Sequence, residues 1–426
     1  MPRLVRVARF AVLLVGVALG AAAQDTPSWT IQQVQRQMLV ADVAYYQFVV
    51  AVGPGPYDKI RVHRLIREQS PHQPMHLSPA IMFFPGEPTY FASLYIEPLI
   101  SKVPARDRSI AIYLAKNNID VWGMDYRWAL VPEDTTDFGF MKDWNMSRDV
   151  ADGQIALTVA RSLRGTSLGP AGPLYVSGLS YGAQITYAIA ANDTQRPPNL
   201  RNVKGIIPLD CGLIFDNADA KAEGCAYRDA AQQTIDGGTY YSDNRFMWQM
   251  GQLAITNPQD PSPFDSTVTN YQFALEVAAS PEDAVIPWHF AGARFRNGLP
   301  YDLRFTEPRL WFDLLEYNEP PYYPVSVDVE GNAVQCDEPG DPAAKVADHL
   351  GDIMVPILYV GAAGGFGHWG DYTATLTASK DVTIHIVQML PDDLQGEDYG
   401  HVDLLAARDA PNVVWPRILA WLQAHR

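Results

Sequence analysis

Residues 174–184, with the sequence LYVSGLSYGAQ, constrain the fold of this chain more than any other stretch. A short apolar run leads into the turn Gly-Leu-Ser-Tyr-Gly at 178–182, and a predicted helix follows from 183 to about 191. A serine in a G-x-S-x-G turn stands at the tip of a strained strand-to-helix bend, where a side chain two residues to either side would collide with backbone. The amino end of the following helix favours negative charge at the same place. We therefore predict that Ser180 is a nucleophile.

Strand and helix patterns alternate on both sides of this turn. Short apolar runs at 81–84, 118–125 and 203–210 predict buried strands, and helical spacing is present at 104–117 and 144–163. This rhythm over residues 79–215 is typical of a parallel, doubly wound sheet. Before it, alternating runs at 41–52 and 60–66, joined by a Gly-Pro-Gly-Pro turn, predict a β-hairpin.

The rhythm breaks in the middle of the chain. Residues 212–348 are rich in aromatic side chains and contain no βα pattern, so we expect helices and loops inserted as a cap. Strands are predicted again at 353–360 and 381–389, and a last helix at 416–424. The expected organisation is a core first part at 24–215, a cap insertion at 216–348 and a core second part at 349–426.

The first 23 residues have the features of a secretory signal peptide. Three arginines surround or precede the apolar run 10–19, and Ala21-Ala22-Ala23 follows, so cleavage is expected after Ala23. The apolar run is too short for a confident membrane span, and no later stretch is long enough, so we expect no stable membrane insertion. The location predicted for the mature protein is secreted or periplasmic.

Charge and cysteine content limit the partners and the redox chemistry. The formal net charge is −16, and loss of three arginines with the signal peptide brings it near −19, which argues against nucleic acid as a partner. Of three cysteines, Cys211 and Cys225 are close in sequence. In an oxidising compartment we expect a bridge between them, and three buried thiols are the alternative.

A serine nucleophile needs a base, most often a histidine held by a carboxylate. His401 lies in a loop after the last predicted strand, after the serine and any acid in chain order, and is the predicted base. Two acids compete. Asp210 directly ends the strand at 203–210, whereas Asp371 lies ten residues into the loop after the strand at 353–360. We favour Asp210, because a buried carboxylate at a strand end is costly unless it is paired.

The oxyanion of a tetrahedral intermediate needs preorganised N–H donors. We expect one from the backbone of Tyr181 and the other from the loop after the strand at 81–84, at Gly86 or Glu87. Histidines and cysteines are too scattered for metal-ligand spacing, so no metal site is expected. The glycine-rich run 361–367 lacks G-x-G-x-x-G spacing, which excludes a dinucleotide site, and no cofactor is expected.

Together these segments resemble the α/β-hydrolase superfamily. The residues that carry the resemblance are Gly178-Leu-Ser-Tyr-Gly182, Phe84-Pro-Gly86, Asp125-Tyr-Arg127 and Gly400-His401. The resemblance implies a mostly parallel sheet flanked by helices, with a cap, and a serine esterase or lipase-like activity. Two features depart from the family pattern: Pro85-Gly86 replaces the usual His-Gly, and the acid's most frequent position is glycine-rich. Some lipases of the superfamily carry the acid one strand earlier, which matches Asp210.

The predicted function is an exported serine hydrolase that cleaves a carboxylic ester through an acyl-enzyme, with a small-molecule ester or short peptide as substrate. A serine peptidase or aminopeptidase of the same fold is an alternative. A non-catalytic binding module on this fold is the alternative from a different class.

Overall fold

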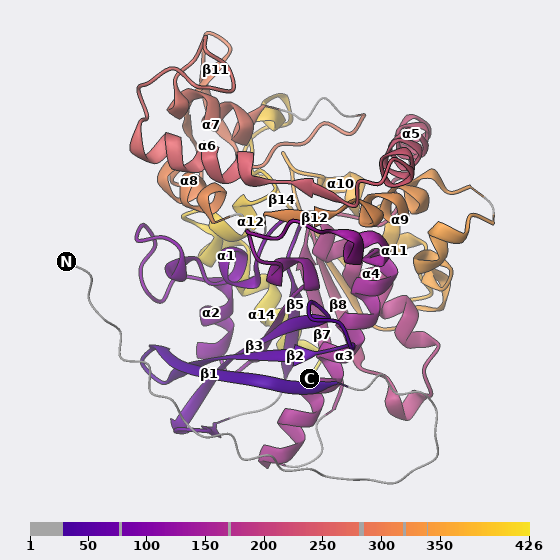
Figure 1. Ribbon diagram of the computed structural model, residues 1–426. Helices are drawn as coiled ribbons and strands as arrows, with labels where there is room; N and C mark the ends of the chain where they lie inside the picture. The colour runs from indigo at the N-terminus through magenta and orange to yellow at the C-terminus, as the bar shows by residue number, and fades with distance from the viewer. Residues whose placement is uncertain (1–28, 76–78, 169–171, 281–284, 318–320, 339) are drawn as a thin grey trace.

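A ten-stranded sheet runs through the molecule in the order β1-β2-β3-β6-β5-β7-β8-β13-β14, with β4 paired to β3 (Figure 1). The computed structural model describes residues 29–75, 79–168, 172–280, 285–317, 321–338 and 340–426, so the predicted signal peptide lies outside the described residues. The strands are β1 (Thr30–Val40), β2 (Val43–Ala51), β3 (Lys59–Ser70), β4 (Gln73–Pro74), β5 (Ala80–Phe84), β6 (Asp120–Asp125), β7 (Leu174–Leu179), β8 (Val203–Leu209), β13 (Ile357–Ala362) and β14 (Val382–Val387).

The six strands from β6 to β14 in this order pair in parallel, and β1, β2, β3 and β6 pair antiparallel to one another in sequence. Helices cover both faces: α1 (Phe91–Tyr95), α2 (Ile110–Lys116), α3 (Met146–Leu168), α4 (Tyr181–Thr194), α10 (Gly367–Gly370), α11 (Tyr372–Thr375), α12 (Asp403–Ala406), α13 (Ala410–Val413) and α14 (Trp415–Ala424). Figure 1 shows α3 and α4 on one side of the sheet and α2 on the other. This is the predicted mostly parallel, helix-flanked architecture.

Successive side chains of β5 alternate between two cores. Ile81 and Phe83 pack in the cluster that includes α2 and α14, whereas Met82 and Phe84 pack in the cluster that includes α3 and α4. All four are fully buried, because the strand lies in the sheet interior with helices on both faces. A strand covered on both faces has apolar residues throughout, which is the pattern seen in the sequence of β5.

The predicted hairpin is confirmed as β2 and β3, which pair antiparallel from Val43 to Ala51. The helix predicted at 104–117 is shorter, because α2 begins only after Ser109, whose side chain accepts the N–H of Ile112 as an N-cap. β1 was not predicted. It lies at the sheet edge, largely exposed, and its polar residues give no strand alternation.

Between β8 and β13 the chain forms helices and short strands: α5 (Ala218–Asp236), β9 (Tyr241–Asp243), α6 (Arg245–Thr256), α7 (Asn270–Ala279), β10 (Ala293–Arg296), β11 (Leu299–Leu303), α8 (Pro308–Glu316), β12 (Tyr322–Pro324) and α9 (Val325–Cys336). Figure 1 shows two groups at one end of the sheet, α6 to α8 in one and α5 with α9 in the other. The first group has its own hydrophobic cluster, which Val402 and Ala406 join from the region of α12.

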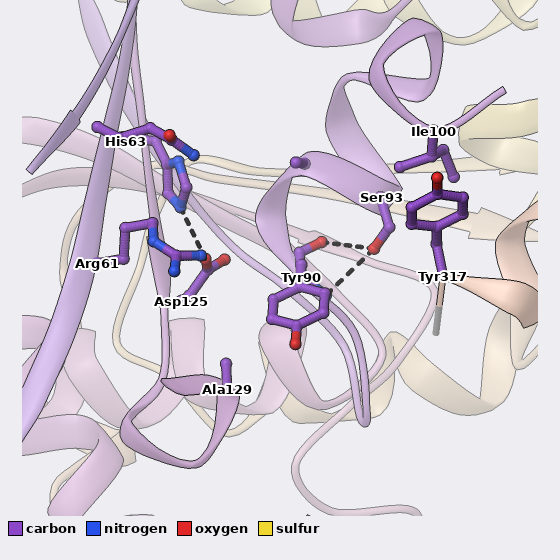
Figure 2. A pocket seen from close by; sticks show the side chains of 10 residues that line it. Arg61, His63, Tyr90, Ser93, Ile100, Asp125, Ala129 and Tyr317 are labelled. Atoms are coloured by element: carbon purple, nitrogen blue, oxygen red, sulfur yellow. Dashed lines mark hydrogen bonds and ion pairs between the residues drawn. The ribbon is translucent and has the colours of Figure 1, made fainter. Parts of the chain in front are cut away.

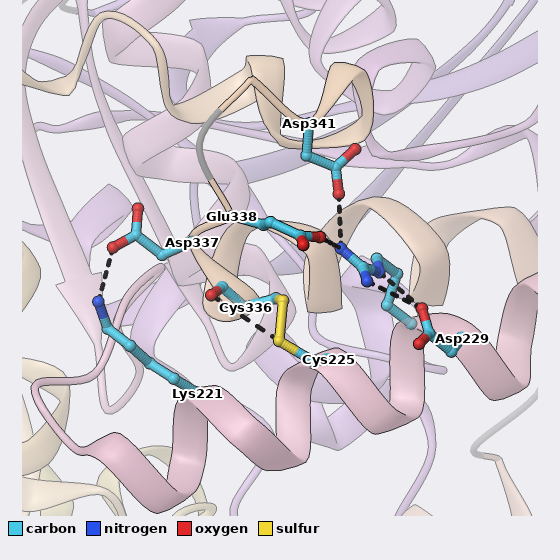
Figure 3. The surroundings of a disulfide bond; sticks show 8 residues. Lys221, Cys225, Asp229, Cys336, Asp337, Glu338 and Asp341 are labelled. Atoms are coloured by element: carbon cyan, nitrogen blue, oxygen red, sulfur yellow. Dashed lines mark hydrogen bonds and ion pairs between the residues drawn. A yellow bond between two sulfur atoms is a disulfide. The ribbon is translucent and has the colours of Figure 1, made fainter.

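A disulfide joins Cys225 on α5 to Cys336 at the end of α9 (Figure 3). The expected bridge between Cys211 and Cys225 is wrong: Cys211 is a buried free thiol just after β8. Cys211 and Cys225 are close in sequence but belong to different elements, because the chain leaves the sheet after Cys211 and enters α5. The true partner of Cys225 lies 111 residues further on.

Removal of this bridge should destabilise the protein. Because it closes a long loop, a Cys225→Ala, Cys336→Ala double variant should lose about 2–4 kcal/mol of unfolding free energy, measured by urea titration. The ion pairs that Arg228 and Lys221 make beside the bridge remain in this variant (Figure 3). A reductant should destabilise the wild type and a Cys211→Ala control but leave the double variant unchanged. A wild type that does not respond to complete reduction would contradict this assignment.

Candidate active site

Ser180 is the single residue that links the end of β7 to the start of α4, with φ 61° and ψ −128°. Non-glycine residues rarely adopt a positive φ, so this backbone is strained. The flanking glycines allow the tight bend. A Cβ on Gly178 would lie 2.4 Å from the carbonyl carbon of Gly182, and a Cβ on Gly182 would lie 2.1 Å from the carbonyl oxygen of Phe84. The bend therefore requires the two glycines and presents the serine at its tip.

The loop that follows β5 lies directly against Ser180. A Cβ on Gly86 would come within 3.0 Å of Ser180 Cβ and 3.7 Å of its Oγ. Tyr181 is the first residue of α4, where the backbone N–H has no acceptor within the helix. Glu87 follows Gly86 and is exposed. The backbone of Gly86 and the amino end of α4 thus flank the serine, as an oxyanion site requires; the donor role of Tyr181, Gly86 and Glu87 stays a prediction.

His401 is paired with Asp210. Nδ1 of His401 lies 2.7 Å from Oδ2 of Asp210, and both side chains are buried. The competing acid, Asp371, instead lies 2.8 Å from Nδ1 of the exposed His368. Within the described part of the chain, Nε2 of His401 is buried and has no hydrogen-bond partner. This nitrogen is therefore the one left for a reacting group.

Asp210 also ends the strand next to that of Ser180. β7 and β8 are neighbours in the sheet, and the N–H of Ser180 donates to the carbonyl oxygen of Leu209, 3.2 Å away. The residue after that carbonyl is Asp210, which itself has a positive φ of 46°. Serine and carboxylate thus leave the same edge of the sheet on adjacent strands.

The glycine-rich loop after β13 wraps the carboxylate of Asp210. Oδ1 accepts the N–H groups of Ala362 at 2.7 Å and Gly367 at 3.0 Å, and Oδ2 accepts that of Phe366 at 3.1 Å. A Cβ on Gly365 would lie 1.9 Å from Oδ2. These donors meet the hydrogen-bonding need of a buried carboxylate. The loop that carries no acid of its own therefore holds the acid of the neighbouring strand.

Aromatic side chains enclose the imidazole of His401. Trp288, Phe290 and Phe366 meet it edge-on, with ring centroids 5.2, 6.4 and 5.5 Å away. The first two come from the inserted segment, which the sequence predicts as an aromatic-rich cap. His401 is buried, with 2% of its surface exposed.

Two buried carboxylates fix the loop that carries His401. Asp403 accepts the N–H groups of Gly292 and Gly400, each at 2.8 Å, and Asp398 accepts those of Met389, Leu390 and Tyr399. Both carboxylates are fully buried, so neither is a solvated surface acid. The residue that precedes Asp398 in the chain, Glu397, pairs with Arg304.

Next to Ser180 in the chain, the hydroxyl of Tyr181 donates to Oδ2 of Asp149 at 2.8 Å. Burial, with nearby Asp152 as a further cause, raises the pKa of Asp149 to about 8. No sequence motif marks this carboxylate, which lies within α3.

Stability should therefore depend on pH through Asp149. Between its ordinary pKa and 8, the folded chain keeps a proton that the unfolded chain releases. The unfolding free energy should fall as pH rises through this window, by at most about 1.4 kcal/mol per pH unit. Urea titrations at pH 5 and pH 8 should show that the wild type loses stability relative to Asp149→Asn. Parallel changes in the two proteins would contradict this expectation.

Comparison with solved structures identifies the fold. A protein of Sulfolobus solfataricus to which lipase activity has been ascribed superposes with a TM-score of 0.61 at 19% identity, over 93% of this chain and 100% of that one. Monoglyceride lipase from Saccharomyces cerevisiae gives 0.47 at 10% identity, over 93% and 96%. The α/β hydrolase GrgF from Penicillium gives 0.46 at 13% identity, over 90% and 98%. The first of these superpositions, with the sheet order and the turn at Ser180, shows that the chain has the α/β-hydrolase fold.

Neither sequence comparison extends this identification: no family model matches the chain, and no curated protein matches it. Among the described residues, no group of histidine, cysteine and acidic side chains could hold a metal ion. Over the same residues, none of the helices has both the length and the apolar character needed to cross a bilayer.

Proposed function

We propose that this protein is an exported serine hydrolase that cleaves carboxylic esters through an acyl-enzyme. Ser180 Oγ attacks the ester carbonyl while Nε2 of His401 takes its proton and later gives it to the leaving alcohol. Asp210 holds Nδ1–H and so fixes the tautomer. Water, deprotonated by the same imidazole, then attacks the acyl-enzyme, and the acid and free Ser180 are released.

One observation carries this proposal: a serine at a strained strand end lies on the strand next to one that ends at a carboxylate bonded to a buried histidine. A binding module without chemistry would not need the strained serine, the buried pair and the glycine loop that seats the carboxylate. The backbone N–H groups near Gly86 and Tyr181 are the proposed oxyanion donors.

A fluorophosphonate probe tests the proposal directly. We expect the chain from residue 24 onward to be labelled at Ser180 and to hydrolyse p-nitrophenyl esters. An unlabelled, inactive but folded protein would favour the binding-module alternative. Turnover of aminoacyl amides in preference to esters would favour a peptidase.

Export is supported by the disulfide between Cys225 and Cys336, since such bridges persist in oxidising compartments. Amino-terminal sequencing of protein recovered from the periplasm or medium should begin at Gln24. Protein retained in the cytoplasm with its first residues intact would contradict export.

A further inference from the structure

A pocket of about 230 Å³ lies outside the residues of the candidate active site (Figure 2). Arg61 and His63 reach it from β3, Asp125 from the carboxyl end of β6, and Tyr90 and Ser93 from the segment around α1. Ile100 and Tyr317 form its opposite side in Figure 2. None of its lining residues is Ser180, Asp210 or His401.

The polar floor of the pocket is built around Asp125. Its Oδ2 lies 2.9 Å from Nη1 of Arg61 and 3.0 Å from Nε2 of His63, and its Oδ1 accepts the N–H of Phe91 at 2.8 Å. Although burial acts to raise it, the neighbouring side chain of His63, the charge of Arg61 and the N–H of Phe91 lower the pKa of Asp125 to about 2. Asp125 is therefore an ionised carboxylate whose two oxygens both have partners within the protein.

The contact with Asp125 leaves part of the Arg61 guanidinium group available for a ligand. Nη1 of Arg61 donates to Asp125. Among the described residues, neither Nε nor Nη2 has a hydrogen-bond or ion-pair partner. The side chain remains 30% exposed at the pocket, although it belongs to a strand of the sheet interior. The planar edge formed by Nε and Nη2 matches the two oxygens of a carboxylate.

The remaining walls are largely apolar. Tyr90 and the exposed ring of Tyr317 stand across the pocket from Arg61, with Ile100 beside them (Figure 2). Aromatic rings of this kind pack against hydrophobic ligand groups. We infer that this pocket binds a small carboxylate that carries a hydrophobic group, with the carboxylate on the free edge of Arg61 and the hydrophobic group between Tyr90 and Tyr317.

Calorimetry with 4-phenylbutyrate tests this inference, and it needs no turnover. The wild type should bind the carboxylate, and the uncharged 4-phenylbutyramide should not bind measurably. Arg61→Gln should weaken binding about tenfold or more, because a charged hydrogen bond is lost. Arg61→Lys should weaken it similarly, because a single ammonium cannot serve Asp125 and offer a planar edge.

Two further variants keep the outcome interpretable. Tyr317→Ser removes only the exposed apolar wall, so it should weaken 4-phenylbutyrate binding without disturbing the bonds of Asp125. Arg294→Gln, at an exposed ion pair with Asp302, is the matched control and should bind like the wild type. Ser180→Ala should also bind like the wild type, which separates this site from the proposed hydrolysis. Equal binding by Arg61→Gln and wild type, equal binding of acid and amide, or no binding by the wild type would overturn the inference.

Discussion

Ser180→Ala should abolish ester hydrolysis, with kcat for p-nitrophenyl acetate reduced by about 10⁶-fold, as expected when a triad nucleophile is removed. The reason is that Ser180 is the residue that the strained end of β7 presents beside Gly86 and the amino end of α4. The measurement is a steady-state rate with active-site titration by a fluorophosphonate. Fold should be retained, because alanine fits where serine already tolerates the positive φ.

The matched control is Ser162→Ala. Its hydroxyl is exposed on α3 and, over the described residues, donates only to the carbonyl oxygen of Thr158, so the rate should equal that of the wild type. If Ser180→Ala hydrolysed the ester as fast as Ser162→Ala, the proposed nucleophile would be wrong.

Asp210→Asn should reduce kcat by about 10⁴-fold, because an amide no longer holds His401 in the tautomer that accepts a proton at Nε2. Asparagine can keep its oxygen on the N–H groups of Ala362 and Gly367, so the loop should stay in place. Its amide nitrogen then faces the N–H of Phe366 and the imidazole. A comparison of melting temperatures with the rate loss separates chemistry from unfolding.

Asp371→Asn decides between the two acids proposed from the sequence. Among the histidines in the part of the chain that the structure describes, Asp371 contacts only the exposed His368, so its variant should keep at least half of the wild-type rate. A large loss in Asp371→Asn together with an active Asp210→Asn would reverse the assignment of the acid.

The parts of the fold that could be predicted are those in which residue type follows directly from burial or from local backbone contacts. The apolar runs of β5 to β8 predict buried parallel strands because each residue is covered on both faces. The glycines around Ser180 predict the turn because the backbone contacts that exclude a side chain are local. His401 could be singled out from its place in chain order, and the structure pairs it with one of the two predicted acids.

The rest depends on contacts between distant segments, which local patterns do not contain. The run 361–367 shows only an excess of glycine, and its purpose becomes visible when Asp210, some 150 residues earlier, is placed inside it. The bridge partner of Cys225 is likewise set by the packing of α5 on α9. Polar β1 gave no strand signal because one side of it has no neighbouring strand.

The shared hydrophobic cluster of α6 to α8 limits how a substrate can reach Ser180. Val402 and Ala406 belong to that cluster, and the N–H groups of His401 and Val402 bond to the carbonyls of His289 and Phe290. If these helices swung outward as a hinged cover, they would pull the proposed base away from its carboxylate. Substrate could then not enter while His401 is held in position to act as the base. We therefore expect α6 to α8 to stay in place during substrate entry, and other segments around Ser180 to rearrange.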